Sequence, residues 1–183
     1  MPTLDRPLPN SYWVIPQRLL AGEYPGDPDP ARARLRLARL GEAGIDSFVD
    51  LTEEDELPPY SLWLPKQADY LRSPIVDAGV PNNVVQTEEV LTAIRTALAR
   101  DRRVYVHCRA GIGRTGLIIG CFLADEKSSG RAALKSLNHL WRQSARASSW
   151  PEVPQTAEQA AYIRGWPKLS KRTLSLAPSG RVR

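Results

Sequence analysis

The stretch from Val104 to Asp125 reads VYVHCRAGIGRTGLIIGCFLAD, and it combines three patterns in succession. Its first residues are apolar or aromatic up to His107, which predicts a short buried strand. A turn-rich segment with Gly111, Gly113 and Gly116 follows, and the apolar run up to about Asp125 then predicts a buried helix. A strand that passes through a glycine-rich loop into a helix is typical of α/β sheets, which bind ligands at the carboxyl ends of their strands.

The rest of the chain alternates between strand and helix patterns. Runs of alternating or β-branched residues predict strands over 11–15, 19–21, 45–51 and 69–76. Apolar residues at helical spacing predict helices over 31–44, 87–98, 131–142 and 156–166, the second of them capped by Thr87. Strands that alternate with helices indicate an α/β fold with a central, mostly parallel sheet flanked by helices, and the glycine-rich loop lies between a central strand and a helix.

Length and composition favour a single folded domain. The 183 residues fall within the usual size of one domain, and 42% hydrophobic with 25% charged residues is not the composition of a disordered chain. We expect residues 1–166 to form this domain. The segment 167–183 is basic and lacks periodicity, so we expect a loosely ordered tail there.

The composition favours neither a membrane span nor a metal site. The longest apolar run, Leu117 to Ala124, is far shorter than the roughly 20 residues that cross a bilayer. The N-terminal segment lacks the apolar core of a signal peptide, so we expect a cytoplasmic protein. Two cysteines without a Cys-x-x-Cys pattern and two distant histidines predict neither a disulfide framework nor a zinc site. The net charge of +5 favours anionic partners only weakly; we expect no nucleic-acid partner, and the oligomeric state stays open.

Three kinds of site have a glycine-rich loop between a strand and a helix. Gly111, Gly113 and Gly116 have the spacing of a dinucleotide-binding loop, but a helical pattern over 131–142 stands where that fold needs a second strand about 20 residues later. A nucleoside triphosphate loop needs a lysine where this chain has Arg114. The third interpretation is a thiolate nucleophile, Cys108, in an anion-binding loop that ends at Arg114.

Elementary electrostatics supports the thiolate. The backbone N–H groups from Arg109 to Arg114 can point at one centre, and the following helix adds its positive end. Such surroundings lower the pKa of a cysteine from about 8.5 to roughly 3.5–7.5, so we expect Cys108 to be ionised. Arg114 provides a planar fork that meets two phosphate oxygens at once.

Three segments of the chain are similar to those of one enzyme superfamily. The segment from His107 to Gly116, HCRAGIGRTG, resembles the signature loop of the cysteine-dependent protein tyrosine phosphatases. The segment from Asp77 to Pro81, DAGVP, resembles the mobile acid loop of the tyrosine-specific members, although Ile75 and Val76 replace the usual Trp and Pro. QTAEQ, at 155–159, resembles their glutamine loop. The spacing between the acid loop and the cysteine is nearer that of the compact dual-specificity phosphatases. The resemblance implies one phosphatase domain that needs no metal ion or organic cofactor.

The resemblance also implies a role for each site residue. Cys108 would attack phosphorus and form a phosphocysteine, while Asp77 would protonate the leaving oxygen and then act as base. Gln155 would orient the hydrolytic water, and Thr115 would donate a hydrogen bond to the departing thiolate. His107 would shape the loop and help to keep the cysteine ionised, or serve only as a buried structural imidazole. The phosphate would be bound by the rest of the loop, namely Arg109, Ala110, Gly111, Ile112, Gly113 and Arg114.

The loop alone leaves the phosphate ester open. Four acids, Glu53, Glu54, Asp55 and Glu56, follow a predicted parallel strand and should border the site, where they would repel a polyanion. This favours a phosphorylated protein, phosphotyrosine at least, or a small phosphomonoester. A phosphoinositide or inositol phosphate substrate is the alternative, and a phosphate-binding module without turnover is a more distant one.

Overall fold

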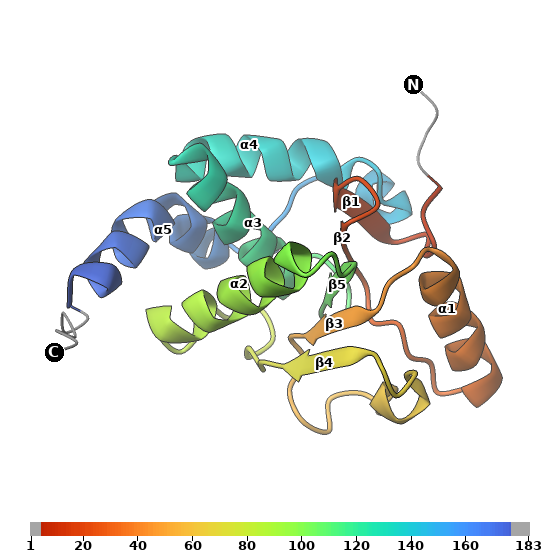
Figure 1. The fold of residues 1–183 in the computed structure, drawn as a ribbon. Coiled ribbons are helices and arrows are strands. Elements are labelled where there is room, and N and C mark those ends of the chain that lie inside the picture. Colours follow the sequence, from red (N-terminus) through yellow and green to blue (C-terminus); the bar gives the residue numbers. More distant parts are fainter. Residues whose placement is uncertain (1–4, 177–183) are drawn as a thin grey trace, which may run out of the picture.

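The computed structural model describes residues 5–176, with side chains described up to Trp166. The chain forms a sheet that is covered by helices on both faces (Figure 1). The strands are β1 (Ser11–Ile15), β2 (Leu19–Gly22), β3 (Ser47–Asp50), β4 (Asp69–Arg72) and β5 (Val104–His107). The helices are α1 (Pro30–Glu42), α2 (Val84–Ala99), α3 (Gly113–Lys127), α4 (Gly130–Trp141) and α5 (Ala157–Leu176), with 3-10 helices η1 (Ser61–Trp63) and η2 (Ala145–Ser148).

The sheet has the strand order β1-β2-β5-β3-β4, and β5 lies at its centre. β1 pairs antiparallel with β2, whereas β2, β5, β3 and β4 run parallel to one another, so the predicted mostly parallel α/β sheet is confirmed. Gly22 of β2 and Asp50 of β3 both stand opposite His107 in the register. The loops that follow these three strands therefore meet at one edge of the sheet, which is where parallel sheets bind ligands.

Side chains of the central strands alternate between two apolar cores. Val104 and Val106 of β5 pack with residues of α2, α3, α4 and α5, while Tyr105 between them packs with Leu40 of α1 and Phe48 of β3. Both faces of β5 are buried, as expected for a central parallel strand. Each aliphatic side chain buried in this way contributes about 1.5–3 kcal/mol, so the two cores hold the loop after β5 on a rigid support.

Three of the predicted element boundaries are wrong by three residues or more, and the others differ by at most two. α2 begins at Val84, because the side chain of Asn83 caps it, and Thr87 is buried inside the helix rather than at its end. β4 ends at Arg72 instead of residue 76, since Pro74 has no N–H to donate. The last helix continues to Leu176, beyond the predicted end at 166, so part of the expected tail is helical; residues 177–183 lie outside the described residues.

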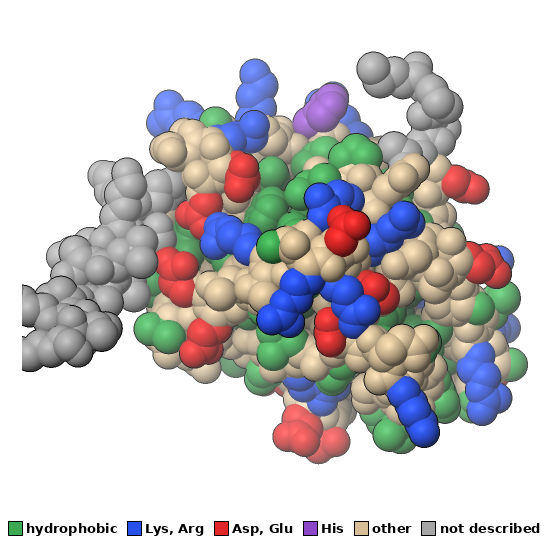
Figure 2. All heavy atoms as spheres, in the orientation of Figure 1, with side chains coloured by type: hydrophobic (Ala, Val, Ile, Leu, Met, Phe, Trp, Pro, Cys, Tyr) green, Lys and Arg blue, Asp and Glu red, His purple; other side chains and the backbone are tan. Residues whose placement is uncertain are grey.

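The described surface carries charges of both signs. Figure 2 shows Lys and Arg side chains interleaved with Asp and Glu over the face in view, not gathered in one basic patch. Arg102, for example, forms ion pairs with Asp46 and Asp69. Within residues 5–176, no helix combines the length and the apolar character that a membrane span requires.

Candidate active site

The glycine-rich loop leaves the carboxyl end of β5 and leads directly into α3. Cys108, its first residue, is buried with 2% of its surface exposed. Gly111 has a φ of +76°, and a Cβ atom there would lie 2.5 Å from the carbonyl carbon of Gly22, so a larger residue would not fit. No described side chain caps the N-terminus of α3 at Gly113, and its first N–H groups are therefore available to an anion.

Arg114, in the first turn of α3, is buried and held by a carboxylate. Its Nη1 and Nη2 donate to the two oxygens of Glu56 at 2.6 and 2.7 Å, and Nη1 also donates to the carbonyl of Ile75 at 3.2 Å. The remaining donor, Nε, is buried and has no hydrogen-bond partner among the described residues. A buried charged donor without a partner is costly, which makes Nε a group that an anionic ligand would satisfy.

The Arg114–Glu56 pair changes the pKa of both groups. Burial disfavours the charge of Arg114, but the hydrogen bonds to Glu56 and the nearby negative charges together outweigh it, and the pKa of the guanidinium is raised. The same hydrogen bonds lower the pKa of Glu56. Glu56 is thus a partner of Arg114, not a free charge at the mouth of the site.

Asp77 lies beside the same guanidinium. Its Oδ1 is 3.0 Å from Nη2 of Arg114, and 60% of its side chain is exposed to solvent. Its backbone N–H donates to Glu53 at 3.4 Å. The structure therefore brings Asp77 and Arg114, two of the predicted site residues, together although they are distant along the chain.

A buried glutamine ties the acid loop to α5. Gln159 is fully buried, and its Nε2 donates to the carbonyl of Gly79 at 2.8 Å, while its Oε1 accepts from the N–H of Thr156 at 3.2 Å. Gln155, the glutamine singled out in the sequence, is exposed and lies over the start of α3, since a Cβ on Gly113 would be 2.8 Å from its Oε1. The four-residue spacing of the two glutamines was the available signal for Gln159.

Thr115 and His107 are both fully buried, one on each side of the loop. The hydroxyl of Thr115 donates to the carbonyl of Gly22 at 3.4 Å, so in this structure its hydrogen bond goes to β2. Nε2 of His107 shares a hydrogen bond of 2.6 Å with the hydroxyl of Tyr60. Burial lowers the pKa of His107 to about 4, so the imidazole is neutral at neutral pH.

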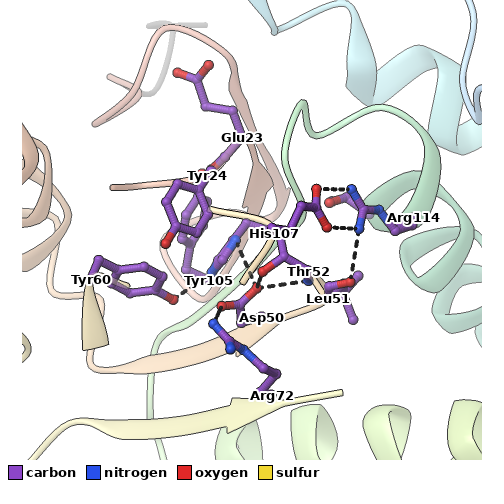
Figure 3. A network of polar contacts seen from close by, with 12 residues as sticks. Glu23, Tyr24, Asp50, Leu51, Thr52, Tyr60, Arg72, Tyr105, His107 and Arg114 are labelled. Atoms are coloured by element: carbon purple, nitrogen blue, oxygen red, sulfur yellow. Dashed lines mark hydrogen bonds and ion pairs between the residues drawn. The ribbon is translucent and has the colours of Figure 1, made fainter. Parts of the chain in front are cut away.

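A buried carboxylate supports the loop from below. Asp50 lies between His107, Thr52 and Arg72 (Figure 3). It accepts hydrogen bonds from Thr52 at 2.6 Å and from Tyr70 at 2.8 Å, and Nδ1 of His107 is 3.9 Å from its Oδ1. Burial opposes its ionisation, but the contact with His107 and these hydrogen bonds keep its pKa below the ordinary value. The end of β3 is thus fixed beside the end of β5.

Arg109 is the exposed basic residue of the loop. It borders a pocket of about 250 Å³ whose wall includes Tyr24, Leu57 and Pro58. The hydroxyl of Tyr24 donates to the carbonyl of Pro58, which joins the loop after β2 to the acidic loop after β3. The lining also includes Glu23, Asp27 and Arg36, so a pocket with both apolar and charged walls lies next to the candidate phosphate site.

Comparison of the sequence with known proteins identifies a matching family and several relatives. Residues 25–127 match the family model described as "Polymorphic toxin system, DSP-PTPase phosphatase". The chain is 39% identical over 94 residues to "Putative tyrosine phosphatase 067L" of Invertebrate iridescent virus 3, an alignment that covers 49% of this chain and 38% of the relative. It is 27% identical over 173 residues to the phosphatidylglycerophosphate phosphatase PTPMT2 of Arabidopsis thaliana, covering 93% of this chain and 71% of the relative.

Solved structures with the same fold include the active form of Tk-PTP. It superposes with a TM-score of 0.71 at 23% identity and covers 87% of this chain and 97% of that chain. At this identity the likeness shows the fold alone. The chain spans less than half the length of the two viral tyrosine phosphatases that it matches.

Proposed function

Because the chain belongs to the family of dual-specificity-type protein tyrosine phosphatases that its family model describes, we propose that it hydrolyses phosphate monoesters through a phosphocysteine on Cys108. The observation that carries the proposal is a buried arginine, six positions after this buried cysteine, whose Nε has no partner among the described residues. A phosphate above Cys108 would accept from Nε and from the free N–H groups at the start of α3.

The reaction has two steps. The thiolate of Cys108 attacks phosphorus, the ester P–O bond breaks, and Asp77 gives its proton to the leaving oxygen. Water then attacks the phosphocysteine, Asp77 takes a proton from that water, and the thiolate leaves. Arg114 and the N–H groups of the loop stabilise the equatorial oxygens in both transition states, as preorganised donors do.

The remaining residues assist these steps. Gln155 orients the water from its position over Gly113, and Thr115 donates to the leaving thiolate once its hydroxyl turns from the Gly22 carbonyl. His107 is neutral and hydrogen-bonded to Tyr60, so its role is to hold the end of β5 in place.

We favour a phosphorylated protein as substrate, with phosphotyrosine as one accepted residue. The pocket beside Arg109 combines apolar residues, Tyr24, Leu57 and Pro58, with charged ones, a lining suited to a peptide. A lipid phosphate is the second candidate, because the similarity to a phosphatidylglycerophosphate phosphatase extends over 93% of the chain. The cytoplasmic location stays a prediction, which cell fractionation would test.

A panel of substrates tests the proposal. Peptides with phosphotyrosine, phosphoserine or phosphothreonine, inositol phosphates and phosphatidylglycerophosphate vesicles would be assayed with the wild type and with Cys108→Ser. We expect release of phosphate from phosphotyrosine peptide by the wild type and background rates for the serine variant. The control is Cys121→Ser, since this second cysteine is buried in the core and lies outside the loop. Absence of turnover on every ester would overturn the proposal.

The variant Asp77→Asn tests the acid. Loss of a positioned general acid costs about 10²–10⁴-fold in rate, so turnover should fall by that factor, and the alkaline limb of the pH profile should disappear. Asp55→Asn, an exposed change in a neighbouring loop, serves as the matched control. If Asp77→Asn kept the full rate and the same pH profile, Asp77 would not be the acid.

A further inference from the structure

Glu23, just after β2, is a buried carboxylate with three donors from different parts of the chain. It is 8% exposed. Its oxygens accept from Asn10 at 2.8 Å and lie 3.0 Å from Nη2 of Arg36 and 3.5 Å from Nη2 of Arg146. A buried acid with two guanidinium partners costs free energy to desolvate, and the chemistry proposed above does not use it.

Arg146 connects this carboxylate to the signature loop. It lies in η2, after α4, and its Nη1 donates to the carbonyl of Ala110 at 2.8 Å. The preceding carbonyl of the loop, that of Arg109, accepts from the N–H of Tyr24 at 3.1 Å. Two successive carbonyl groups of the loop are therefore bound from outside, one by a side chain and one by the backbone that follows Glu23.

The orientation of these carbonyls fixes the orientation of the N–H groups. In a trans peptide unit, the C=O of one residue and the N–H of the next point in opposite directions. With the carbonyls of Arg109 and Ala110 bound on the outer side, the N–H groups of Ala110 and Gly111 face the inside of the loop. These are two of the donors that a phosphate above Cys108 would meet.

We propose that Arg146 and Glu23 form a positioning pair that holds the signature loop in its anion-binding conformation. Arg146 binds the Ala110 carbonyl, and Glu23 fixes the guanidinium of Arg146 at the distance this requires. Neither side chain touches the phosphate. Gly111 packs on the backbone of Gly22 and Glu23, which places the pair directly behind the loop. The inference rests on the proposed function, because it assigns a role within the same site.

The test compares Arg146→Met with Arg142→Met. Both remove one positive charge from the same region of the chain, and Arg142 is exposed. For Arg146→Met we expect a loss of about 10²-fold in kcat/KM, because small misplacements of catalytic groups cost that much. We also expect weaker inhibition by vanadate, and alkylation of Cys108 by iodoacetamide that begins at higher pH. Arg142→Met should match the wild type in all three measurements.

Vanadate inhibition and alkylation separate a positioning role from a structural one. If Arg146→Met lowered the melting temperature but left both measurements at wild-type values, the pair would only join η2 to β2, and the inference would be wrong. If Arg146→Met does not fold, Glu23→Gln provides the second variant, since the amide keeps the size of the side chain but removes its charge and leaves a single oxygen to accept from its three donors. Glu23→Gln should shift the same two measurements in the same direction by a smaller factor, and unchanged values would again overturn the inference.

The two proposals can fail separately. Protection of Cys108 from alkylation by vanadate does not require turnover. If the wild type hydrolysed no ester but vanadate protected Cys108 in an Arg146-dependent way, the proposed function would fail and the positioning pair would stand. If turnover were normal and Arg146→Met were indistinguishable from Arg142→Met, only the positioning pair would fail.

Discussion

Glu56 decides how Arg114 presents its donors. Its two carboxylate oxygens bind Nη1 and Nη2, so Nε is the guanidinium nitrogen that has no partner among the described residues. Removing one partner from a buried ion pair is expensive because the other charge stays buried. From the sequence, Glu56 is expected to repel a polyanion at the mouth of the site. In the structure it orients Arg114 instead.

Glu56→Gln should weaken the site without removing any group that contacts phosphate. The amide oxygen can accept only one of the two charge-assisted hydrogen bonds, so we expect a cost of about 1–3 kcal/mol, or about 5- to 150-fold in kcat/KM. Steady-state kinetics on a phosphotyrosine peptide measure this loss. Glu54→Gln, in the exposed part of the same loop, should stay within twofold of the wild type. Equal rates for both variants would mean that Glu56 does not orient Arg114.

His107 makes stability depend on pH in a defined window. Its pKa in the folded protein is about 4, below the ordinary value near 6.5, so the unfolded chain binds more protons between these values. Stability is then fully present above about pH 6.5 and falls as the pH drops toward 4, with a slope of at most about 1.4 kcal/mol per unit. Urea unfolding at several pH values measures the slope.

A histidine variant tests whether His107 causes this pH dependence of stability. His107→Gln should be less stable at neutral pH but should lose the dependence in this window, whereas His139→Gln, on the exposed side of α4, should keep it. The lowered pKa values of Asp50 and Glu56 act at lower pH, below about 4.5, and do not produce the same signal. An unchanged slope in His107→Gln would contradict the assignment.

The sequence predicted the residues of the loop but not their partners. Cys108, Arg114 and the glycines lie within one short segment, so their spacing and the resemblance of that segment to a known signature loop single them out as candidates. Glu56 is 58 positions from Arg114, and Arg146 is 36 positions from Ala110. Such contacts follow from how β3 and η2 are placed around β5, and no local pattern in the sequence encodes them.

At the scale of the elements, the types were predictable and the boundaries less so. The helix over 113–127 follows from an apolar run, but the start of α2 was assigned to Thr87 because Glu88 and Glu89 follow it. Asn83 caps the helix instead, since its side chain accepts from the N–H of Gln86 at 2.9 Å. Thr87 is buried, and its hydroxyl shares a hydrogen bond of 2.8 Å with the hydroxyl of Tyr162.

The contact between α4 and α5 depends on a glycine at the start of α4. A Cβ on Gly130 would lie 2.2 Å from the carbonyl oxygen of Ile163 and 2.5 Å from Cα of Arg164, both backbone atoms of α5. Gly130→Ala should therefore destabilise the fold by about 1–3 kcal/mol, the usual cost of overpacking. Gly41→Ala in α1 is the control, because nothing lies within 4 Å of its Cβ. There we expect a gain of about 0.5–1 kcal/mol. Thermal unfolding measures both, and equal melting temperatures would contradict the packing argument.

At the scale of the whole molecule, the structure alters the charge argument about substrates. Of the four acids after β3, Glu56 is paired with Arg114 and Glu53 accepts from the N–H of Asp77. Only Glu54 and Asp55 are exposed. The field that a polyanionic substrate meets at this edge of the sheet is therefore weaker than four free carboxylates would produce, and the preference for a peptide over an inositol phosphate should depend on these two residues.

The double variant Glu54→Lys with Asp55→Asn tests this preference. Asparagine is chosen at 55 because Asp55 has a φ of +63°, a conformation that Asn tolerates and Lys does not favour. The change raises the charge of the loop by three without touching Arg114, Asp77 or Cys108.

We expect the ratio of kcat/KM for inositol polyphosphate over phosphotyrosine peptide to rise about tenfold at low salt, through faster association of the more highly charged substrate. The rise should shrink as ionic strength increases, since the screening length falls to about 8 Å at 0.15 M. A ratio that stays constant at low salt would show that charge at this edge does not select the substrate, and the pocket beside Arg109 would then be the feature to vary.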